Sequence, residues 1–182
     1  MLWGAASGAL ELRQTEGGAR LTGRFPYATE AELAPGRAEL VEPKAFAQRV
    51  DAGGDIHLLF AHDYAQPLAS RAAGSLTLRD TAEALEFEAE IAAGTSWARD
   101  FLEAHKAGLI RGLSPGFRVV PGGERVEQRG TGLLRRVIRA ELFELSAVTR
   151  PAYGAAQIEA RNWTPGRSDT AARMPARYRW RA

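Results

Sequence analysis

Much of the chain alternates apolar and polar residues with the period of two that is typical of β-strands. The clearest case is residues 84–92, where apolar side chains from Leu85 to Ile91 alternate with three glutamates. Together with residues 71–80, this segment is predicted to form a hairpin. Further strands are predicted over residues 19–27, 55–62 and 113–121, and over 133–148 as a strand pair or as one bent strand. The pattern therefore predicts a mainly β protein.

Two segments have helical spacing instead. Residues 95–108 repeat apolar side chains such as Phe101 at helical spacing, with Ser96 as the expected N-cap and Gly108 as the stop. A shorter helix is predicted over residues 43–50, because a proline stands in its first turn and glycines follow it.

Polar, turn-rich stretches separate these elements. Residues 28–42 and 122–132 are predicted to be loops. A chain of 182 residues is most simply one domain, and this domain is expected over residues 19–160. It is preceded by an N-terminal arm at 1–18, which could add a strand. It is followed by residues 161–182, whose arginines and prolines predict a mobile tail.

The order of elements indicates an α+β fold that is mainly β, with peripheral helices around a closed or partly open β-barrel or a sandwich. The composition, 45% hydrophobic and 25% charged, is that of an ordinary soluble globular protein. The chain has no cysteine, which excludes a disulfide framework, a thiolate nucleophile and a cysteine-bound metal. Neither of the common nucleotide-binding glycine motifs occurs, so no cofactor is expected.

The charge distribution argues against a nucleic-acid partner and against a membrane. The net charge is only +2, and the arginines form no single basic block with interleaved aromatics. No run of about 18 apolar residues occurs, and residues 1–12 do not resemble a secretory signal, so a cytoplasmic location is predicted. One alternative remains open, in which the arginine-rich tail tethers the protein to a capsid or to nucleic acid.

Three short sequence motifs contain the candidate catalytic residues. They are Ala-His-Asp at 61–63, Gly-Leu-Ser-Pro-Gly at 112–116 and Glu-Leu-Ser-Ala-Val-Thr-Arg-Pro-Ala at 144–152. The second matches the G-x-S-x-G nucleophile elbow, but an α/β-hydrolase needs a histidine after its serine. All three histidines of this chain precede Ser114. The reading that survives is a serine hydrolase with the order histidine, serine, acid.

His62 is the candidate general base, because it ends an apolar strand before a polar loop and is therefore both fixed and accessible. The alternative is a surface histidine at a strand end. Ser114 is the candidate nucleophile in a tight glycine-rich turn, and the alternative is an ordinary turn serine. Pro115 has no N–H, so Gly116 is the expected backbone donor to an oxyanion.

Glu144 is the candidate acid, because a carboxylate among apolar strand residues needs a partner. An ion pair with an arginine is an equally good explanation. Glu141 is less favoured, since simple alternation places it on the opposite face of the strand, whereas Leu142 should share a face with Glu144. Asp63 should point away from His62 for the same reason.

The other histidines indicate no metal site. His57 and His62 are expected on opposite faces of one strand, so they do not form a metal-binding pair. His105 shares a predicted helix face with Phe101, and it is interpreted as a packing or surface residue.

Four segments in order resemble the tailed-phage prohead (capsid maturation) serine protease family. The resemblance extends over roughly residues 20–160. Its four segments are Glu-Pro-Lys-Ala-Phe at 42–46, Leu-Leu-Phe-Ala-His-Asp at 58–63 with Pro-Leu at 67–68, the stretch from 106 to 117 around Ser114, and residues 142–152. Lys44 and Ala69 stand where this family often has glycine, which affects the expected loop shape more than catalysis.

The resemblance implies a serine endopeptidase with a herpesvirus assemblin-type fold, a β-barrel ringed by helices. It implies Ser114 as nucleophile, His62 as base and Glu144 as third member. It further implies the major capsid protein and a separate scaffolding protein as substrates, with the portal as another partner. Whether the protein forms a homodimer is left open. Such enzymes act inside the procapsid in the host cytoplasm and often cleave themselves.

Two other functions remain as alternatives. A capsid-assembly protein that cuts nothing would not need His62 within hydrogen-bond reach, about 3 Å, of Ser114. A small-molecule serine esterase would need an apolar pocket beside Ser114 rather than an open groove for an extended peptide.

Overall fold

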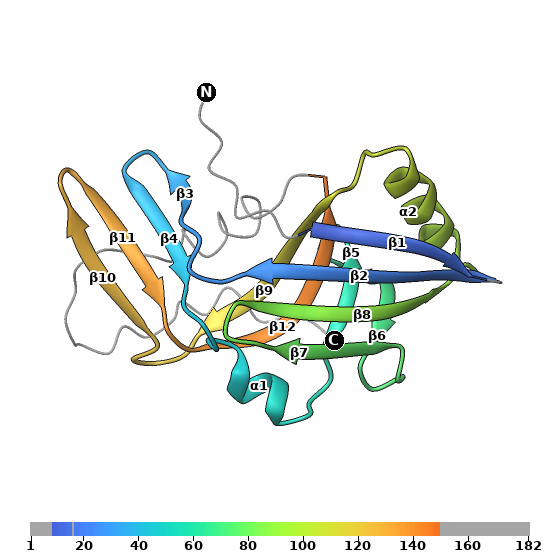
Figure 1. Cartoon of the computed structure of the whole chain (residues 1–182), viewed down its shortest axis with the longest axis horizontal. Coiled ribbons are helices and arrows are strands. Elements are labelled where there is room, and N and C mark those ends of the chain that lie inside the picture. The colour runs from blue at the N-terminus through green and yellow to red at the C-terminus, as the bar shows by residue number, and fades with distance from the viewer. Residues whose placement is uncertain (1–8, 16, 150–182) are drawn as a thin grey trace, which may run out of the picture.

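The computed structural model describes residues 9–15 and 17–149 of the chain (Figure 1). This part contains twelve strands and two helices. In chain order they are β1 (Ala9–Thr15), β2 (Gly18–Pro26), β3 (Ala31–Ala34), β4 (Arg37–Val41), α1 (Ala47–Asp51), β5 (His57–Phe60), β6 (Asp63–Ser70), β7 (Leu76–Asp80), β8 (Ala84–Ala92), α2 (Ser96–Lys106), β9 (Gly112–Val119), β10 (Glu124–Arg129), β11 (Gly132–Val137) and β12 (Ala140–Val148). The prediction of a mainly β protein is confirmed.

The strands form three four-stranded sheets (Figure 1). The front sheet has the order β1-β2-β8-β7, the central sheet β6-β5-β12-β9, and the lateral sheet β10-β11-β4-β3. Each sheet has two edge strands, so the described strands close into no barrel, and two helices do not form a ring around them. The closed form of the expected barrel is therefore corrected to three open sheets. The physical reason is that the strand pattern specifies inward and outward faces but not which strand pairs with which.

The main core lies between the front and central sheets. In β8 the alternation predicted from the sequence is confirmed, because Leu85, Phe87, Ala89 and Ile91 are buried and the glutamates between them are not. The Phe87 ring occupies the space that a side chain at Gly23 of β2 would need. From the central sheet, Leu58, Leu113 and Leu145 belong to the same core cluster. Each such leucine contributes about 1.5–3 kcal/mol by its burial.

The helices cover opposite ends of this core (Figure 1). α2 buries Ala98 and Phe101, and its N-cap is Thr95, whose Oγ1 accepts a hydrogen bond from the Ala98 N–H at 3.3 Å. The expected cap, Ser96, is instead the first helical residue. A cap residue needs extended backbone angles, which Thr95 has.

The lateral sheet corrects two loop predictions. Residues 28–42 contain β3 and β4, and residues 122–132 contain β10. Their charged side chains concealed the strands, because several of these charges are paired within the sheet. Arg135 of β11, 5% exposed, binds Glu39 of β4 at 2.9 Å and Glu124 of β10 at 2.6 Å. Residues 133–148, predicted as a strand pair or as one bent strand, form β11 and β12, which lie in two different sheets.

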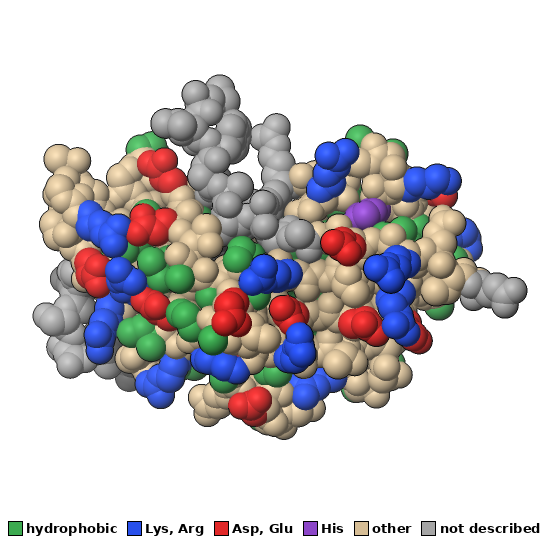
Figure 2. All heavy atoms as spheres, viewed as in Figure 1, with side chains coloured by type: hydrophobic (Ala, Val, Ile, Leu, Met, Phe, Trp, Pro, Cys, Tyr) green, Lys and Arg blue, Asp and Glu red, His purple; other side chains and the backbone are tan. Residues whose placement is uncertain are grey.

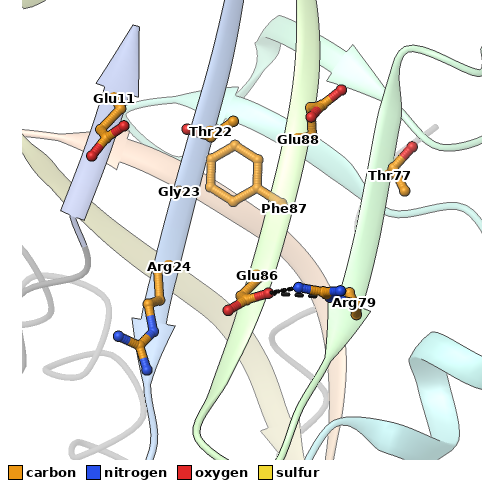
Figure 3. Close-up of a pocket in the computed structure, with 9 residues that line it drawn as sticks. All are labelled: Glu11, Thr22, Gly23, Arg24, Thr77, Arg79, Glu86, Phe87 and Glu88. Carbon is orange, nitrogen blue, oxygen red and sulfur yellow. Dashed lines mark hydrogen bonds and ion pairs between the residues drawn. The ribbon is translucent and has the colours of Figure 1, made fainter.

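The outer face of the front sheet is polar, and basic and acidic side chains are intermixed on the visible face of the molecule (Figure 2). A hollow on the front sheet is lined in part by ion-paired residues (Figure 3). Arg79 of β7 binds Glu86 of β8 at 2.7 Å across this hollow. No helix in the described residues is long and apolar enough to cross a membrane.

Candidate active site

The candidate residues lie on neighbouring strands of the central sheet. β12 pairs with β5 in parallel and with β9 antiparallel. In this register Glu144 stands between His57 of β5 and Gly116 of β9. Two residues further along, Ser146 stands next to Ser114 of β9. Residues in register point to the same side of a sheet, so these side chains share one face.

The two faces of the central sheet have different roles. Leu145 alternates with Glu144 and Ser146, and it packs into the main core with its register neighbours Leu58 and Pro115 on the same side. The opposite face carries the polar residues, and we call it the site face. Glu144 and Ser146 are nevertheless buried, at 4% and 0% exposed. A buried carboxylate requires hydrogen-bond partners, and here it has them.

A β-bulge decides which acidic residues reach this face. The register with β9 shifts between Leu142 and Glu144, so that Phe143 is the extra residue. Glu141, opposite Arg118, therefore lies on the site face, and Leu142 lies on the core face. Simple alternation predicted the reverse for both residues, and it was wrong because the bulge changes the phase by one residue.

His62 is held by a left-handed turn rather than by a strand. β5 ends at Phe60, and Ala61 and His62 have φ angles of 53° and 63°. The Ala61 N–H donates to the Ala147 carbonyl oxygen at 3.1 Å, and the His62 N–H donates to Ser146 Oγ at 3.1 Å. Such angles in residues other than glycine cost on the order of 1–3 kcal/mol each and are typical of functional sites.

The expectation that His57 and His62 face opposite ways rested on strand alternation. It fails because His62 lies beyond the end of the strand. The turn directs the His62 ring back towards Glu144, whose register neighbour is His57.

The imidazole of His62 binds the Glu144 carboxylate. The distance from Nδ1 to Oε1 is 2.8 Å, and the two side chains are 29% and 6% exposed. With a carboxylate as acceptor, the neutral imidazole has its proton on Nδ1, which leaves Nε2 as an acceptor. Glu144 Oε2 accepts a hydrogen bond from the Ser146 hydroxyl at 2.6 Å. Both carboxylate oxygens are thus used, and the partner of Glu144 is a histidine rather than an arginine.

Gly116 makes room for this carboxylate. A Cβ at position 116 would overlap Oε1 and Cδ of Glu144. Because Gly116 has no side chain, the Glu144 carboxylate can lie over the backbone of β9 while it binds His62. This steric role was not predicted from the sequence, where Gly116 was considered only as a backbone donor.

Ser114 is close to these residues in register but is not hydrogen-bonded to His62, the candidate base. It stands opposite Ser146, whose hydroxyl accepts from the His62 N–H, and it is 2% exposed. Within residues 9–15 and 17–149, neither the Ser114 hydroxyl nor His62 Nε2 has a hydrogen bond to the other. The structure therefore joins His62 and Glu144 directly and places Ser114, the candidate nucleophile, on the neighbouring strand β9.

The competing acids are used elsewhere. Glu141 binds Arg118 at 2.7 Å. Asp63 accepts hydrogen bonds from the Ala65 N–H at 2.8 Å and from Gln66 Nε2 at 3.0 Å, so it stabilises the start of β6. Neither carboxylate is bound to His62.

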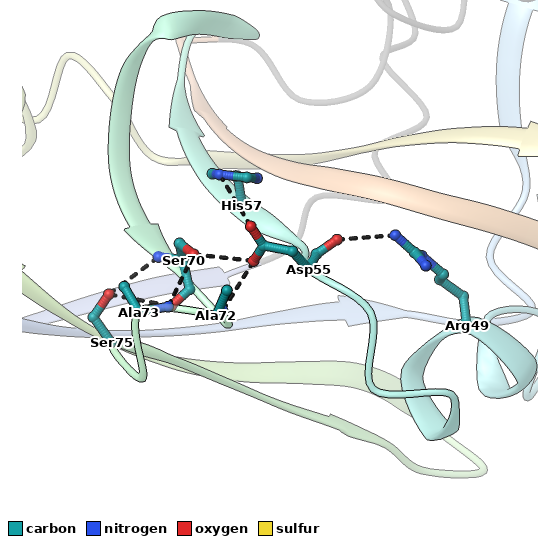
Figure 4. A network of polar contacts seen from close by, with 7 residues as sticks. All are labelled: Arg49, Asp55, His57, Ser70, Ala72, Ala73 and Ser75. Atoms are coloured by element: carbon teal, nitrogen blue, oxygen red, sulfur yellow. Dashed lines mark hydrogen bonds and ion pairs between the residues drawn. The ribbon is translucent and has the colours of Figure 1, made fainter.

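His57 belongs to a separate polar network around Asp55 (Figure 4). Asp55 Oδ1 accepts hydrogen bonds from Ser70 Oγ at 3.0 Å and from the Ala72 N–H at 2.9 Å, and Oδ2 lies 3.5 Å from His57 Nε2. The hydrogen bond from Ala72, above all, lowers the pKa of Asp55. This network anchors the β6–β7 turn next to the site.

The remaining groups near the site are an aromatic ring and a packed histidine. Tyr64 of β6 is 59% exposed and packs its ring edge-on against His57, with centroids 6.1 Å apart. Partial burial, and then the Glu144 carboxylate, raise the pKa of Tyr64. His105 packs on Phe101, as one sequence interpretation proposed, and burial followed by the charge of Arg111 lowers its pKa.

Ser146 contacts both His62 and Glu144, which the sequence did not lead us to expect, although strand alternation placed Ser146 on the same face as Glu144. The available signal was a small hydroxyl two positions after the candidate acid in an otherwise apolar strand. No group of three or more histidine, aspartate or glutamate side chains in the described part of the chain is arranged to hold a metal ion.

Comparison with known proteins decides the family. A model of the family described as caudovirus prohead serine protease matches residues 8–167. The chain belongs to this family. Its members are serine proteases, which are hydrolases, of phage capsid maturation. The match covers all three sequence motifs of the candidate site. It does not itself assign the roles of His62, Ser114 and Glu144. Searches of curated proteins and of solved structures found no significant match.

Proposed function

We propose that this protein is a serine endopeptidase in which Ser114 is the nucleophile, His62 the general base and Glu144 the orienting acid. The observation that carries the proposal is the 2.8 Å bond between His62 Nδ1 and Glu144 Oε1. It selects the tautomer in which Nε2 can accept a proton, and it will stabilise the imidazolium that forms. The order histidine, serine, acid along the chain is compatible with this assignment.

The proposed reaction proceeds through an acyl-enzyme. His62 Nε2 takes the proton of Ser114 Oγ while Oγ bonds to the carbonyl carbon of the substrate, and the carbonyl π pair moves to oxygen. When the tetrahedral intermediate collapses, the C–N bond breaks and His62 gives the proton to the leaving amine. In the second half of the reaction, His62 takes a proton from water while the water oxygen attacks the acyl-enzyme ester. The ester C–O bond then breaks, His62 returns the proton to Ser114 Oγ, and the carboxylic acid product leaves.

Two features of the site must change when substrate binds. Ser114 is 2% exposed, so a substrate must displace what covers it. The serine–histidine hydrogen bond must also form, and such bonds often shorten only in the substrate complex. We keep Gly116 as the proposed backbone donor to the oxyanion, because Pro115 has no N–H.

The proposed substrates are the proteins of the assembling procapsid. Family membership supports capsid-related substrates in general and a place in the procapsid inside the host cell. Within this class we propose the major capsid protein and a scaffolding protein, with self-cleavage as a further event and the portal as a contact. The assemblin-type fold and a homodimer stay predictions. Residues 161–182, the predicted tail, lie outside the described residues.

The deciding experiment follows intact mass over time for wild type and for Ser114→Ala, each alone and mixed with the capsid and scaffolding proteins of the same phage. We expect wild type to shorten itself or one of the two partners, and Ser114→Ala to leave all of them whole with an unchanged melting temperature. The masses of the products will locate the cleavage sites.

The other outcomes separate the alternatives. If Ser114→Ala cleaves at nearly the wild-type rate, Ser114 is not the nucleophile. If both proteins leave capsid and scaffold whole at high concentration, the capsid-assembly alternative is favoured. Hydrolysis of small esters by wild type, with no cleavage of any protein, would instead favour the esterase alternative.

A further inference from the structure

The Ser146 hydroxyl is bonded to both members of the base–acid pair. Its oxygen accepts the His62 backbone N–H at 3.1 Å, and its proton goes to Glu144 Oε2 at 2.6 Å. The donor and the acceptor capacity of one hydroxyl are thus used in two different directions. The side chain is fully buried, so water does not compete for these bonds.

These two bonds act on different parts of the site. The bond to Oε2 fixes the rotation of the Glu144 carboxylate, so that Oε1 points at His62 Nδ1. The bond from the His62 N–H supports a backbone turn with two residues other than glycine at positive φ, Ala61 and His62. Without the hydroxyl, the turn would keep only the bond from the Ala61 N–H to Ala147 among those described above.

We propose that Ser146 is a positioning residue that couples the orientation of Glu144 to the backbone position of His62. It touches neither substrate nor reacting atoms, and it acts through the pair. Since Ser146 also stands opposite Ser114, this one position on β12 holds His62, Glu144 and Ser114 in place relative to one another. This inference rests on the proposed function, because it concerns the same three residues.

The first test is kinetic and compares Ser146→Ala with wild type on a cleaved capsid-derived peptide. We expect kcat to fall about 10- to 100-fold with KM little changed, because loosened positioning affects the transition state more than substrate binding. In a Glu144→Gln background, Ser146→Ala should cost less than about twofold, since the residue through which it acts is already impaired.

The second test does not depend on cleavage. In the Ser114→Ala protein, NMR of the imidazole N–H protons should reveal a strongly downfield His62 Nδ1–H signal from the bond to Glu144. Adding Ser146→Ala should broaden or remove this signal at the same pH. The two tests fail separately. Cleavage by the Ser114→Ala protein would overturn the proposed function but not the inference about Ser146. An unchanged His62 signal after Ser146→Ala would overturn the inference about Ser146 but not the proposed function.

Ser75→Ala is the matched control. Ser75 is a half-buried serine whose hydroxyl also accepts from one backbone N–H, that of Ser70 at 3.1 Å, and donates to a neighbouring group, the Ser70 carbonyl oxygen at 3.3 Å. It lies in the polar network of Figure 4, outside the base–acid pair. Its replacement should lower the melting temperature without moving kcat or the His62 signal.

Two further results bear on the role of the hydroxyl. Ser146→Thr, which keeps the hydroxyl, should retain the NMR signal and most of kcat if it melts like wild type. A folded Ser146→Ala protein that keeps both the wild-type kcat and the His62 signal would overturn the inference, whatever its melting temperature.

Discussion

The Glu144 carboxylate occupies the space that a side chain at position 116 would fill. Gly116 is the register neighbour of Glu144 on β9, and a Cβ there would overlap Oε1, the oxygen that binds His62. The glycine of the serine motif and the acid of the third motif are thus complementary in shape. The contact links two motifs that lie far apart in the chain.

Gly116→Ala should therefore separate His62 and Glu144. The new methyl group must push the carboxylate aside, and a displacement of about 1 Å in such a site can cost about 10²-fold in rate. Overpacking should also cost about 1–3 kcal/mol of stability. Cleavage rate and melting temperature are the measurements. Gly94→Ala is the control, since nothing lies within 4 Å of its Cβ position, and equal activity of the two variants would contradict the argument.

Glu144→Gln should keep the shape of the site and remove its charge. We expect kcat to fall about 10²–10⁴-fold, because the amide cannot stabilise the imidazolium and can hold the wrong tautomer. The loss should be smaller than for His62→Ala if Glu144 only orients the base. Glu141→Gln is a control on the same strand and face, where the carboxylate binds Arg118. It should keep a rate within about twofold of wild type, and equal losses in both variants would refute the assignment.

Asp80→Asn should change how stability depends on pH. Burial raises the pKa of Asp80, although the Tyr27 hydroxyl, which donates to Oδ1 at 2.9 Å, and Lys44 oppose this. Between the ordinary value, about 3.9, and the raised one, the folded chain binds more protons, so this group lowers stability as pH rises through that window.

Asparagine keeps the acceptor for Tyr27 and cannot ionise. The melting temperature of Asp80→Asn relative to wild type should therefore increase as pH rises from about 3.5 to 7. Asp100→Asn, at an exposed position of α2, is the matched control substitution. A flat difference curve for Asp80→Asn would contradict the prediction.

His105→Phe should protect the protein against mild acid. Burial, and then Arg111, lower the pKa of His105, and its Nε2 is buried without a partner among the described residues. Below the unfolded-state value, about 6.5, the unfolded chain binds more protons, so wild-type stability falls as pH decreases towards the folded-state value. Phenylalanine keeps the ring contact with Phe101 and removes this titration.

The measurement is the difference in melting temperature between His105→Phe and wild type at pH 7.5 and 5.5. His57 and His62 are present in both proteins, so their titration cancels in this difference. We expect the difference to grow in favour of the variant at the lower pH. An identical loss of stability in both proteins would show that His105 does not contribute.

The elements that the sequence predicted well are those with strong local periodicity. The β7–β8 hairpin and α2 appear where alternation and helical spacing place them. β3, β4 and β10 were missed, because a charge paired across strands, such as Arg135 with Glu39, looks like a solvent-exposed charge in sequence. The sheet order, which excludes a closed barrel among the described strands, depends on pairings between distant segments, such as β11 with β4.

The sequence by itself determined the mainly β architecture, the phage protease resemblance and the identity of the three candidate residues. Only the tertiary structure decided that Glu144, and neither Glu141 nor Asp63, binds His62. The physical reasons are the left-handed turn, which takes His62 out of its strand and directs it at Glu144, and the ion pair of Glu141 with Arg118. Neither leaves a periodic signal in the chain, because the turn depends on contacts with a distant strand, as in the His62–Glu144 contact, |i−j| = 82, and the face on which Glu141 meets Arg118 is set by the bulge at Phe143 in the β9–β12 pairing.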